Sequence, residues 1–411
     1  MGPQAVSAPP LPGGTTAASP ASREEPSVYI NFWYVAARSG EITFGAERPV
    51  KVQILGHHFA LWRDRSGKVC CISDTCSHRG GALADGRIRG DCVECPYHGW
   101  TFDAEGQCVR LPSLGRDAKI PDRTHVDAYP VQERYGLVHV FLGDLPEAER
   151  PPVIDIPEYS DPAWRFITLE MTWNIDYKRS VENTMDPGHN EFTHPTHGFL
   201  GVKPDYHVRD FDLTDQVWGT GFFIRMDAPT LAQRDMNAAA GRSGDKWIEN
   251  GVGNFGPHCT WTYIHPSDQA QMHGFAFHTP VDEVTDHIYV LFGRNFLGDP
   301  KYDQTFEQRA LYVAEQDRYV LEPLRPKLTP PQNNREFFVP ADKCIARYRD
   351  YCQQWEQRGW RIDVARLRAD RDTVAYAIPS PARRQKKGWV LPAVPLLQPA
   401  AAGTAARSGK A

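Results

Sequence analysis

Apolar and polar positions alternate in short runs through the first third of the chain. Between about residues 27 and 145 these runs are separated by tight turns, the pattern of short antiparallel strands. Strands are expected at 50–55, 59–63, 68–72 and 136–142. The pattern predicts a small all-β module, followed by a Pro-rich linker at 145–157.

Beyond the linker the pattern changes to a mixture of helices and longer strands. A helical stretch is expected at 181–191 and a second helix at about 305–324, stopped by Pro323 and Pro326. Between them, a hairpin is expected at 259–265 and 272–278 and a strand at 287–296. The fold class predicted for the whole chain is therefore α+β, a small all-β domain joined to a larger domain with an antiparallel sheet.

The helix predicted at 305–324 has one carboxylate in its apolar stripe. At about 100° per residue, Asp317 lies about 20° from the origin of the stripe at Phe306, whereas Glu315 and Glu322 point nearly opposite. The apolar members of the stripe are Phe306, Ala310, Val313, Val320 and Leu324. A carboxylate there is costly to bury unless it is paired or binds a metal. Asp317 is thus a candidate metal ligand, with a buried salt bridge to an arginine as the alternative.

Length and composition set the boundaries of these domains. The 411 residues divide into a disordered tail at 1–26, a β domain at 27–145, a second domain at 146–393 and a disordered tail at 394–411. A net charge of −5 argues against nucleic acid as the main partner. We find neither a membrane-length apolar run nor a secretory signal, and expect a cytoplasmic protein.

Cysteine usage directs attention to one stretch of the β module. Six of the nine cysteines fall between Cys70 and Cys108, and two of these pair with histidines, as Cys76/His78 and Cys95/His98. Zinc sites usually pair like ligands, as C-x2-4-C followed by H-x3-5-H. One Cys and one His in each loop instead suit a two-iron cluster, with two thiolates on one iron and two imidazoles on the other. Zinc and chance are the alternatives.

The motif C-S-H-R-G…C-P-Y-H-G-W resembles the Rieske signature of ring-hydroxylating and demethylating oxygenases. The resemblance implies a Rieske [2Fe–2S] cluster on Cys76, His78, Cys95 and His98. Arg79, Arg87 and Arg89 lie on the same loops. They form either a docking patch for an acidic ferredoxin or reductase, or a solvated loop face.

A second constellation follows in V-E-N-T-M-D-P-G-H-N-E-F-T-H, residues 181–194. Two imidazoles and a carboxylate form the facial triad of non-haem iron oxygenases. His189 and His194 would diverge by about 140° on an unbroken helix, so the helix must be distorted near Pro187-Gly188. The alternative is two ordinary surface histidines near a helix end.

This segment also resembles the same family, with N-x2-D-x2-H-x4-H similar to the mononuclear iron motif of aromatic O-demethylases. The resemblance covers roughly residues 29–325 and implies iron ligands His189, His194 and Asp317 in a catalytic domain of helix-grip type. It further implies that Asp186 bridges to the Rieske histidine of a neighbouring subunit, in a homotrimer. Asp186 can also hydrogen-bond the free ring nitrogen of His189. Asn183 either lies near the iron or caps the helix.

The implied activity is that of a terminal oxygenase component that hydroxylates a small aromatic or similar compound with O2. Electrons would come from NAD(P)H through a separate reductase, with or without a ferredoxin. Oxidative O- or N-demethylation is the alternative outcome. A non-catalytic Rieske electron-transfer protein and a zinc-dependent structural protein are the competing functions. Pocket candidates between residues 200 and 300 are His258, Tyr263, Phe275, Phe277, Arg294 and Asn295.

Overall fold

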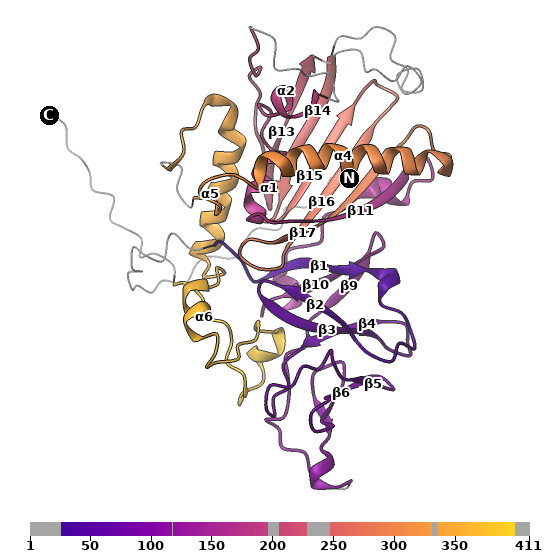
Figure 1. Cartoon of the computed structure of the whole chain (residues 1–411), viewed down its shortest axis with the longest axis vertical. Helices are drawn as coiled ribbons and strands as arrows, with labels where there is room; N and C mark the ends of the chain where they lie inside the picture. Colours follow the sequence, from indigo (N-terminus) through magenta and orange to yellow (C-terminus); the bar gives the residue numbers. More distant parts are fainter. Residues whose placement is uncertain (1–25, 117, 196–204, 228–246, 331–334, 399–411) are drawn as a thin grey trace, which may run out of the picture.

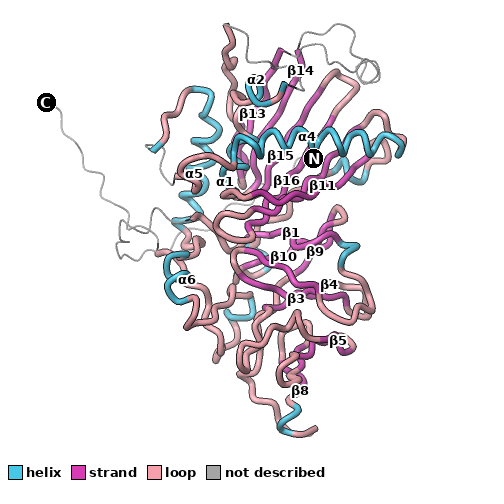
Figure 2. The backbone as a smooth tube through the Cα atoms, in the orientation of Figure 1, coloured by secondary structure: helices cyan, strands magenta, loops and turns pink. Residues whose placement is uncertain are grey.

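The computed structural model describes residues 26–116, 118–195, 205–227, 247–330 and 335–398. These residues form a β-rich N-terminal module and a larger sheet domain, which follow one another along the long axis of the molecule (Figure 1). Loops make up much of the N-terminal module, whereas the sheet domain is built from long strands and helices (Figure 2).

The N-terminal module contains three antiparallel sheets. Their strand orders are β1-β10-β9, β2-β3-β4 and β5-β6-β7-β8. The strands are β1 (Phe32–Arg38), β2 (Val50–Ile54), β3 (His57–Arg63), β4 (Val69–Ser73), β5 (Arg87–Arg89), β6 (Cys92–Glu94), β7 (Thr101–Phe102), β8 (Cys108–Arg110), β9 (Val131–Arg134) and β10 (Leu137–Leu142). The four strands predicted here are confirmed to within about two residues at each end.

The sheet domain is organised around one antiparallel sheet in the order β11-β17-β16-β15-β14-β13-β12. The strands are β11 (Arg165–Trp173), β12 (Thr214–Gln216), β13 (Gly219–Asp227), β14 (Trp247–Phe255), β15 (Cys259–His265), β16 (Met272–Pro280) and β17 (Asp286–Arg294). The predicted β15–β16 hairpin is confirmed, with Cys259 opposite Phe277 and Ile264 opposite Met272.

Helices cover one face of this sheet, and α4 crosses it in Figure 1. The α-helices are α1 (Tyr177–Thr184), α2 (Asn190–Thr193), α4 (Asp303–Leu321), α5 (Lys343–Gln357) and α6 (Val364–Asp370). Short 3-10 turns lie at Ser39–Glu41, Pro112–Leu114, Glu147–Glu149, Pro157–Ser160, Pro300–Tyr302, Pro340–Asp342 and Pro381–Arg384. In the described part of the chain, no helix combines the length and apolar character needed to cross a bilayer.

The apolar stripe of α4 follows the prediction as far as Asp317 and then departs from it. Phe306 and Leu321 are buried, whereas Val320 and Leu324 are exposed. The helix ends at Leu321, so Leu324 lies beyond it. Leu321, four residues after Asp317, is the next residue on the buried side of the helix. The predicted end of the stripe was therefore wrong, but the half-buried position of Asp317 was right.

The helix expected at 181–191 is broken where the sequence indicates. Helix α1 ends at Thr184, and α2 begins only at Asn190. Pro187 and Gly188 occupy the gap, because proline cannot continue the hydrogen-bond pattern of a helix.

Two other segments differ from the expected domain plan. The Pro-rich segment is packed rather than free, since Leu145 and Val153 are buried against Trp33 and Phe141. The tail predicted from 394 is ordered at its start, because Val394 is only 3% exposed. The remainder of that tail, from 399, and residues 1–25 lie outside the described residues.

The C-terminal part of the chain returns to the N-terminal module, although the sequence assigns it to the second domain. The Arg383 guanidinium pairs with Asp127 at 2.6 Å, and Tyr129 Oη donates to the Ile378 carbonyl at 2.8 Å. Both contacts join the two parts of the chain, which therefore share a core rather than meet at a simple linker.

Candidate metal centres

Two loops of the N-terminal module share one backbone pattern. Gly80 N donates to the Cys76 carbonyl at 2.9 Å, and Gly99 N donates to the Cys95 carbonyl at 3.0 Å. Each turn closes on a glycine with positive φ, 72° at Gly80 and 70° at Gly99, a conformation that glycine adopts without steric cost. We call residues 76–81 and 95–100 the ligand loops.

The ligand loops place thiols inside the module and imidazoles outside it. Cys76 and Cys95 are buried, while His78 and His98 are exposed. The two imidazole rings lie 4.5 Å apart between centroids, and the His78 ring stacks on Trp100 at 4.4 Å. The four predicted donors are thus brought together, each loop supplying one of each kind.

The arrangement of the four donors suits a cluster. Each ligand loop supplies one buried thiol and one exposed imidazole, so the thiols lie on the inner side and the imidazoles on the outer side. That division suits a centre with two metals, one held by thiolates and the other by imidazoles.

The space around the sulfurs is tight. A Cβ added at Gly81 would lie 3.0 Å from Cys95 Sγ, so any larger side chain here would press on this sulfur atom. A hydrogen bond from the Cys76 thiol lowers the pKa of Cys95 to about 6, while the same contact raises the pKa of Cys76. One member of the pair is therefore readily available as thiolate, the form that binds metal.

The second predicted site lies around α2. His189 is the residue before this one-turn helix and His194 the residue after it, so the break in the helix lets both rings face one point. Their Nε2 atoms are 3.3 Å apart. Asp317 Oδ1, from α4, lies 3.3 Å from His194 Nε2 and 3.6 Å from His189 Nε2. A triangle of this size fits one metal with bonds of about 2.0–2.2 Å.

Each donor side chain of this triangle is oriented by a hydrogen bond to a neighbouring residue. The Nδ1 atoms of His189 and His194 contact the Asp186 carbonyl at 2.7 Å and Gln316 Oε1 at 3.0 Å. Asn183 Nδ2 donates to Asp317 Oδ1 at 3.1 Å. With both Nδ1 atoms bound to oxygen, the Nε2 lone pairs are left for a metal.

The position of Asp186 corrects one expectation. Its backbone carbonyl, and not its carboxylate, accepts the hydrogen bond from His189 Nδ1. The carboxylate lies 3.8 Å from that nitrogen and accepts from Gly188 N at 2.6 Å. The side chain of Asn183 contacts Asp317 rather than capping the helix.

The two histidines titrate differently because their surroundings differ. Burial lowers the pKa of His189. Burial by itself would also lower the pKa of His194. The hydrogen bond between His194 and the Asp317 carboxylate outweighs this effect and raises the pKa of His194 above its usual value. A metal requires neutral imidazoles, so on binding it would replace the proton that Asp317 favours on His194.

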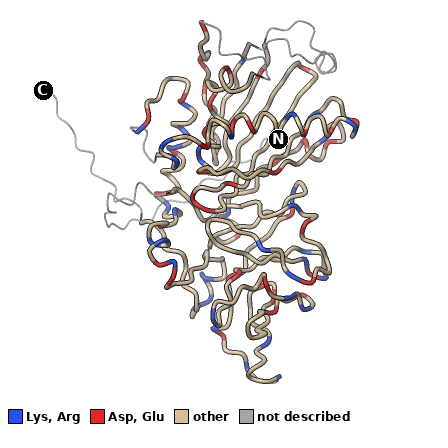
Figure 3. The backbone as a smooth tube through the Cα atoms, viewed as in Figure 1, with Lys and Arg blue, Asp and Glu red and all other residues tan. Residues whose placement is uncertain are grey.

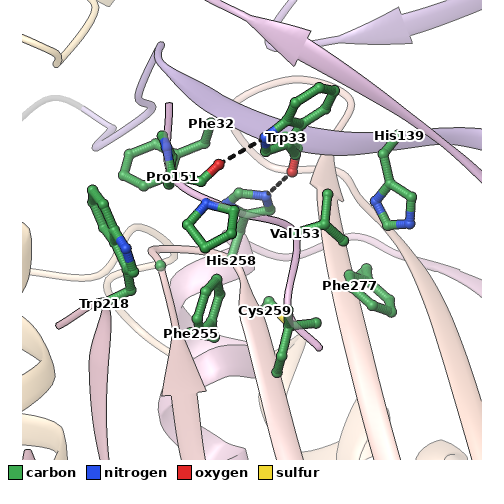
Figure 4. Close-up of a pocket in the computed structure, with 13 residues that line it drawn as sticks. Phe32, Trp33, His139, Pro151, Val153, Trp218, Phe255, His258, Cys259 and Phe277 are labelled. Carbon is green, nitrogen blue, oxygen red and sulfur yellow. Dashed lines mark hydrogen bonds between the residues drawn. The ribbon is translucent and has the colours of Figure 1, made fainter. Parts of the chain in front are cut away.

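The pocket candidates from the sheet do not lie at this triangle. His258 and Phe277 line a cavity of about 30 Å³ between the N-terminal module and the sheet (Figure 4), the volume of about one water molecule. There His258 Nε2 donates to the Trp33 carbonyl at 2.7 Å. Arg294 is fully buried and pairs with Asp303 at 2.7 Å.

The other three candidates also have structural contacts. Asn295 binds the 269–271 turn through its amide. Tyr263 packs against the core of Phe275 on the sheet face that meets the N-terminal module. Sequence reasoning missed Gln316 and Trp100, because neither belongs to a recognisable spacing and only the folded contacts reveal them.

Comparison with protein families gives two matches that together cover more than half of the chain. Residues 32–130 match the Rieske [2Fe-2S] domain, and residues 173–358 match the vanillate O-demethylase oxygenase C-terminal domain. The first match spans both ligand loops and the second spans the His189, His194 and Asp317 triangle.

Two relatives align over most of their length. The toluene-4-sulfonate monooxygenase system iron-sulfur subunit of Comamonas testosteroni is 29% identical over 71% of this chain and 86% of its own. The dicamba O-demethylase oxygenase component of Stenotrophomonas maltophilia is 27% identical over 80% and 97%. Both names describe one component of a larger system.

A solved structure shares the fold. Dicamba monooxygenase bound to dicamba superposes with a TM-score of 0.66 at 24% identity, over 80% of this chain and 98% of that chain. With two family matches in the correct order and both donor sets in place, this chain belongs to the Rieske non-haem iron oxygenases, as a terminal oxygenase component with a [2Fe–2S] cluster and a mononuclear iron.

Proposed function

We propose that Cys76, His78, Cys95 and His98 hold the [2Fe–2S] cluster and that His189, His194 and Asp317 hold the mononuclear iron. The observation that carries this assignment is that each donor set is already oriented for metal in the same chain, by turns in one case and by hydrogen bonds in the other. When bound, the cluster supplies one-electron transfer and the mononuclear iron supplies the site of O2 activation.

The residues around the triangle have separate tasks. Gln316 and the Asp186 carbonyl fix the ring orientations of His194 and His189. Asn183 holds Asp317 through one oxygen. These groups keep the donors on one side, which leaves the opposite side for O2 and substrate.

We propose a small aromatic compound as substrate and hydroxylation as the reaction, with O- or N-demethylation as the alternative outcome. The names of the relatives, with toluene-4-sulfonate and dicamba, support an aromatic ring.

Product analysis tests the reaction. The enzyme is incubated with NADH, a surrogate reductase and a panel of aromatic acids and methyl ethers. Hydroxylated products without formaldehyde indicate ring or side-chain hydroxylation, and formaldehyde indicates demethylation. An enzyme that is reduced by the reductase but consumes no O2 with any substrate would instead be a non-catalytic electron carrier.

A homotrimer with electron transfer between subunits is the assembly we propose. In one chain the ligand loops, next to β5 and β6, and the triangle at α2 lie at opposite ends (Figure 1). A head-to-tail ring would bring the triangle next to the partner subunit's His98, with Asp186 between them. The exposure of Phe192 (66%) and Phe337 (93%) on the sheet domain, and of Tyr97 (58%) beside His98, supports contact surfaces at both ends.

The electron donor is proposed to be an NAD(P)H reductase, directly or through a ferredoxin, which docks near Arg79, Arg87 and Arg89. All three arginines are exposed, and Figure 3 shows basic positions on the loops of this end of the molecule. A cytoplasmic location is also proposed, since none of the nine cysteines, all within the described residues, forms a disulfide, as expected in a reducing compartment.

Metal analysis tests the ligand assignment directly. A fully loaded sample should contain about three irons and two acid-labile sulfides per chain. Zinc in place of iron, or a protein without visible absorption, would rule out the assignment.

A further inference from the structure

A second pair of histidines lies at the tip of the β15–β16 hairpin and belongs to neither of the donor sets described above. His265 is the last residue of β15, and His273 is the second residue of β16. Side chains alternate between the two faces of a strand. Ala276 packs against α4 through Ala314, so His273, three residues earlier, faces away from α4.

The two imidazoles are the centre of a continuous series of polar contacts. Glu158 Oε1 lies 2.9 Å from His273 Nδ1. His273 Nε2 lies 3.3 Å from His265 Nε2. His265 Nδ1 in turn lies 3.5 Å from Glu249 Oε2, and Glu249 Oε1 lies 3.8 Å from Arg225 Nε.

The 2.9 Å contact with Glu158 shows that His273 Nδ1 carries hydrogen, so His273 Nε2 presents a lone pair to His265. His265 Nδ1 lies 3.5 Å from the Glu249 carboxylate, beyond the usual hydrogen-bond range. When His265 also carries its hydrogen on Nδ1, both Nε2 lone pairs face each other and can bind one metal ion between them; in the other tautomer, His265 donates a hydrogen bond to His273.

The separation of the two nitrogens also suits a metal. At 3.3 Å the contact is a long hydrogen bond. Two nitrogens on one tetrahedral Zn²⁺ with bonds of about 2.0–2.1 Å lie about 3.3 Å apart. The His189 and His194 pair, in the triangle assigned to iron, has the same Nε2 separation of 3.3 Å.

The surroundings hold this pair in place. The His273 ring lies 3.9 Å from Tyr263, in a stacked arrangement, and 4.5 Å from Trp164. The side chain of His273 is 7% exposed and that of His265 is 22% exposed. One ligand is therefore fixed by packing, and the other can be reached from solvent.

We propose that His265 and His273 form a binding site for a divalent metal ion of the zinc class, with Glu249 and Glu158 holding the ligand rings and water completing the coordination. Carboxylate–histidine–metal arrangements orient the imidazole and strengthen it as a ligand. Imidazole donors suit zinc, copper and nickel. Bound metal would fasten the hairpin tip to the turn Pro157–Ser160, which carries Glu158.

The test uses the iron-loaded enzyme and Zn²⁺. Wild type, His265→Gln and His287→Gln are equilibrated with Zn²⁺, freed of unbound metal and analysed for zinc and iron in the same sample. His287 is a matched control, because it also lies on the sheet beside a glutamate, 4.0 Å from Glu170, but contacts a threonine hydroxyl instead of a second imidazole. We expect wild type and His287→Gln to bind one more zinc per chain than His265→Gln, with unchanged iron.

Equal zinc in all three proteins would overturn the proposal, and so would a gain of zinc matched by a loss of iron. If His265→Gln fails to fold, wild-type crystals of the iron-loaded enzyme soaked in Zn²⁺ give a second measurement. An anomalous difference peak at the zinc edge, within bonding distance of both Nε2 atoms, supports the site. Absence of that peak, with the pair sharing only a proton, refutes it.

Discussion

The ligand loops and the iron triangle orient their donors in different ways. In the ligand loops, backbone hydrogen bonds within each turn fix the positions of Cys76 and Cys95. In the triangle, side chains do this work: Gln316 holds His194, and Asn183 holds Asp317. The first site is local to one module, whereas the second exists only when α4 is docked on the sheet beside α1 and α2.

This difference has a consequence for loading. A change in α4 should empty the triangle and leave the cluster intact, because the hydrogen bonds that close each ligand loop lie within that loop. A change in a ligand loop should have the opposite effect. The two sites are therefore expected to be separable by mutation, although catalysis needs both.

Asp317→Ala is expected to have the largest effect. Loss of the carboxylate removes one ligand and leaves Asn183 without its partner, so the mononuclear iron should be lost. Turnover should then fall by more than about a hundredfold, because changes in residues that only orient a metal ligand typically cost about 10–100-fold. Iron should fall from about three to about two per chain with an unchanged cluster spectrum. Glu307→Ala, on the exposed side of the same helix, is the control. A fall in cluster absorption would contradict the separation.

Asp186→Asn tests the connection between the two sites. The substitution keeps the backbone carbonyl that orients His189 and removes the charge, so both metals should stay bound. Turnover with the physiological reductase is expected to fall by about 10–100-fold. Asp205→Asn, an exposed aspartate in the same region, should turn over normally. Normal turnover in Asp186→Asn would refute the bridge to the partner subunit's His98.

The sequence predicted those features that depend on local spacing. The mixed Cys/His pairs predicted that the two loops lie together, because both loops are short turns in which spacing determines geometry. Asp317 was expected to face the interior because one carboxylate in an apolar helical stripe needs a partner, and it lies beside His189 and His194. Even the break near Pro187 followed from the five-residue separation of His189 and His194.

Features that depend on contacts between distant segments were not predictable. Gln316 lies about 100° around α4 from Asp317 and gains its role only through the position of His194. The contact of Arg383 with Asp127 joins residues 256 apart, and no pattern indicates it. The His265 and His273 pair depends on the hairpin register, which places Tyr263 opposite His273.

Gly81→Ala tests how tightly the ligand loops enclose the cluster. The new Cβ would lie 3.0 Å from Cys95 Sγ, and a sulfur bound to iron cannot move aside. We expect cluster occupancy to fall several-fold, measured by acid-labile sulfide and visible absorption, with the third iron retained. Gly40→Ala, where an added Cβ meets nothing within 4 Å, should load normally. Equal loss of all three irons would show that the two sites are not independent.

The smallest effect is expected from the basic residues of the ligand-loop end. Arg87 is exposed on β5, so its charge acts on a docking partner through solvent and is screened within about 8–10 Å at ordinary salt. Arg87→Glu should slow reduction of the cluster by an acidic donor protein a few-fold at low salt. Raising the salt should remove this difference between variant and wild type, because salt screens the long-range attraction that guides the donor more than it weakens short-range contacts in the complex. Stopped-flow reduction at several ionic strengths measures this, with Arg371→Glu after α6 as the control. If the rate of wild type is independent of ionic strength, these arginines are only a solvated face, and recognition of the donor depends on the uncharged surface around Tyr97 and His98.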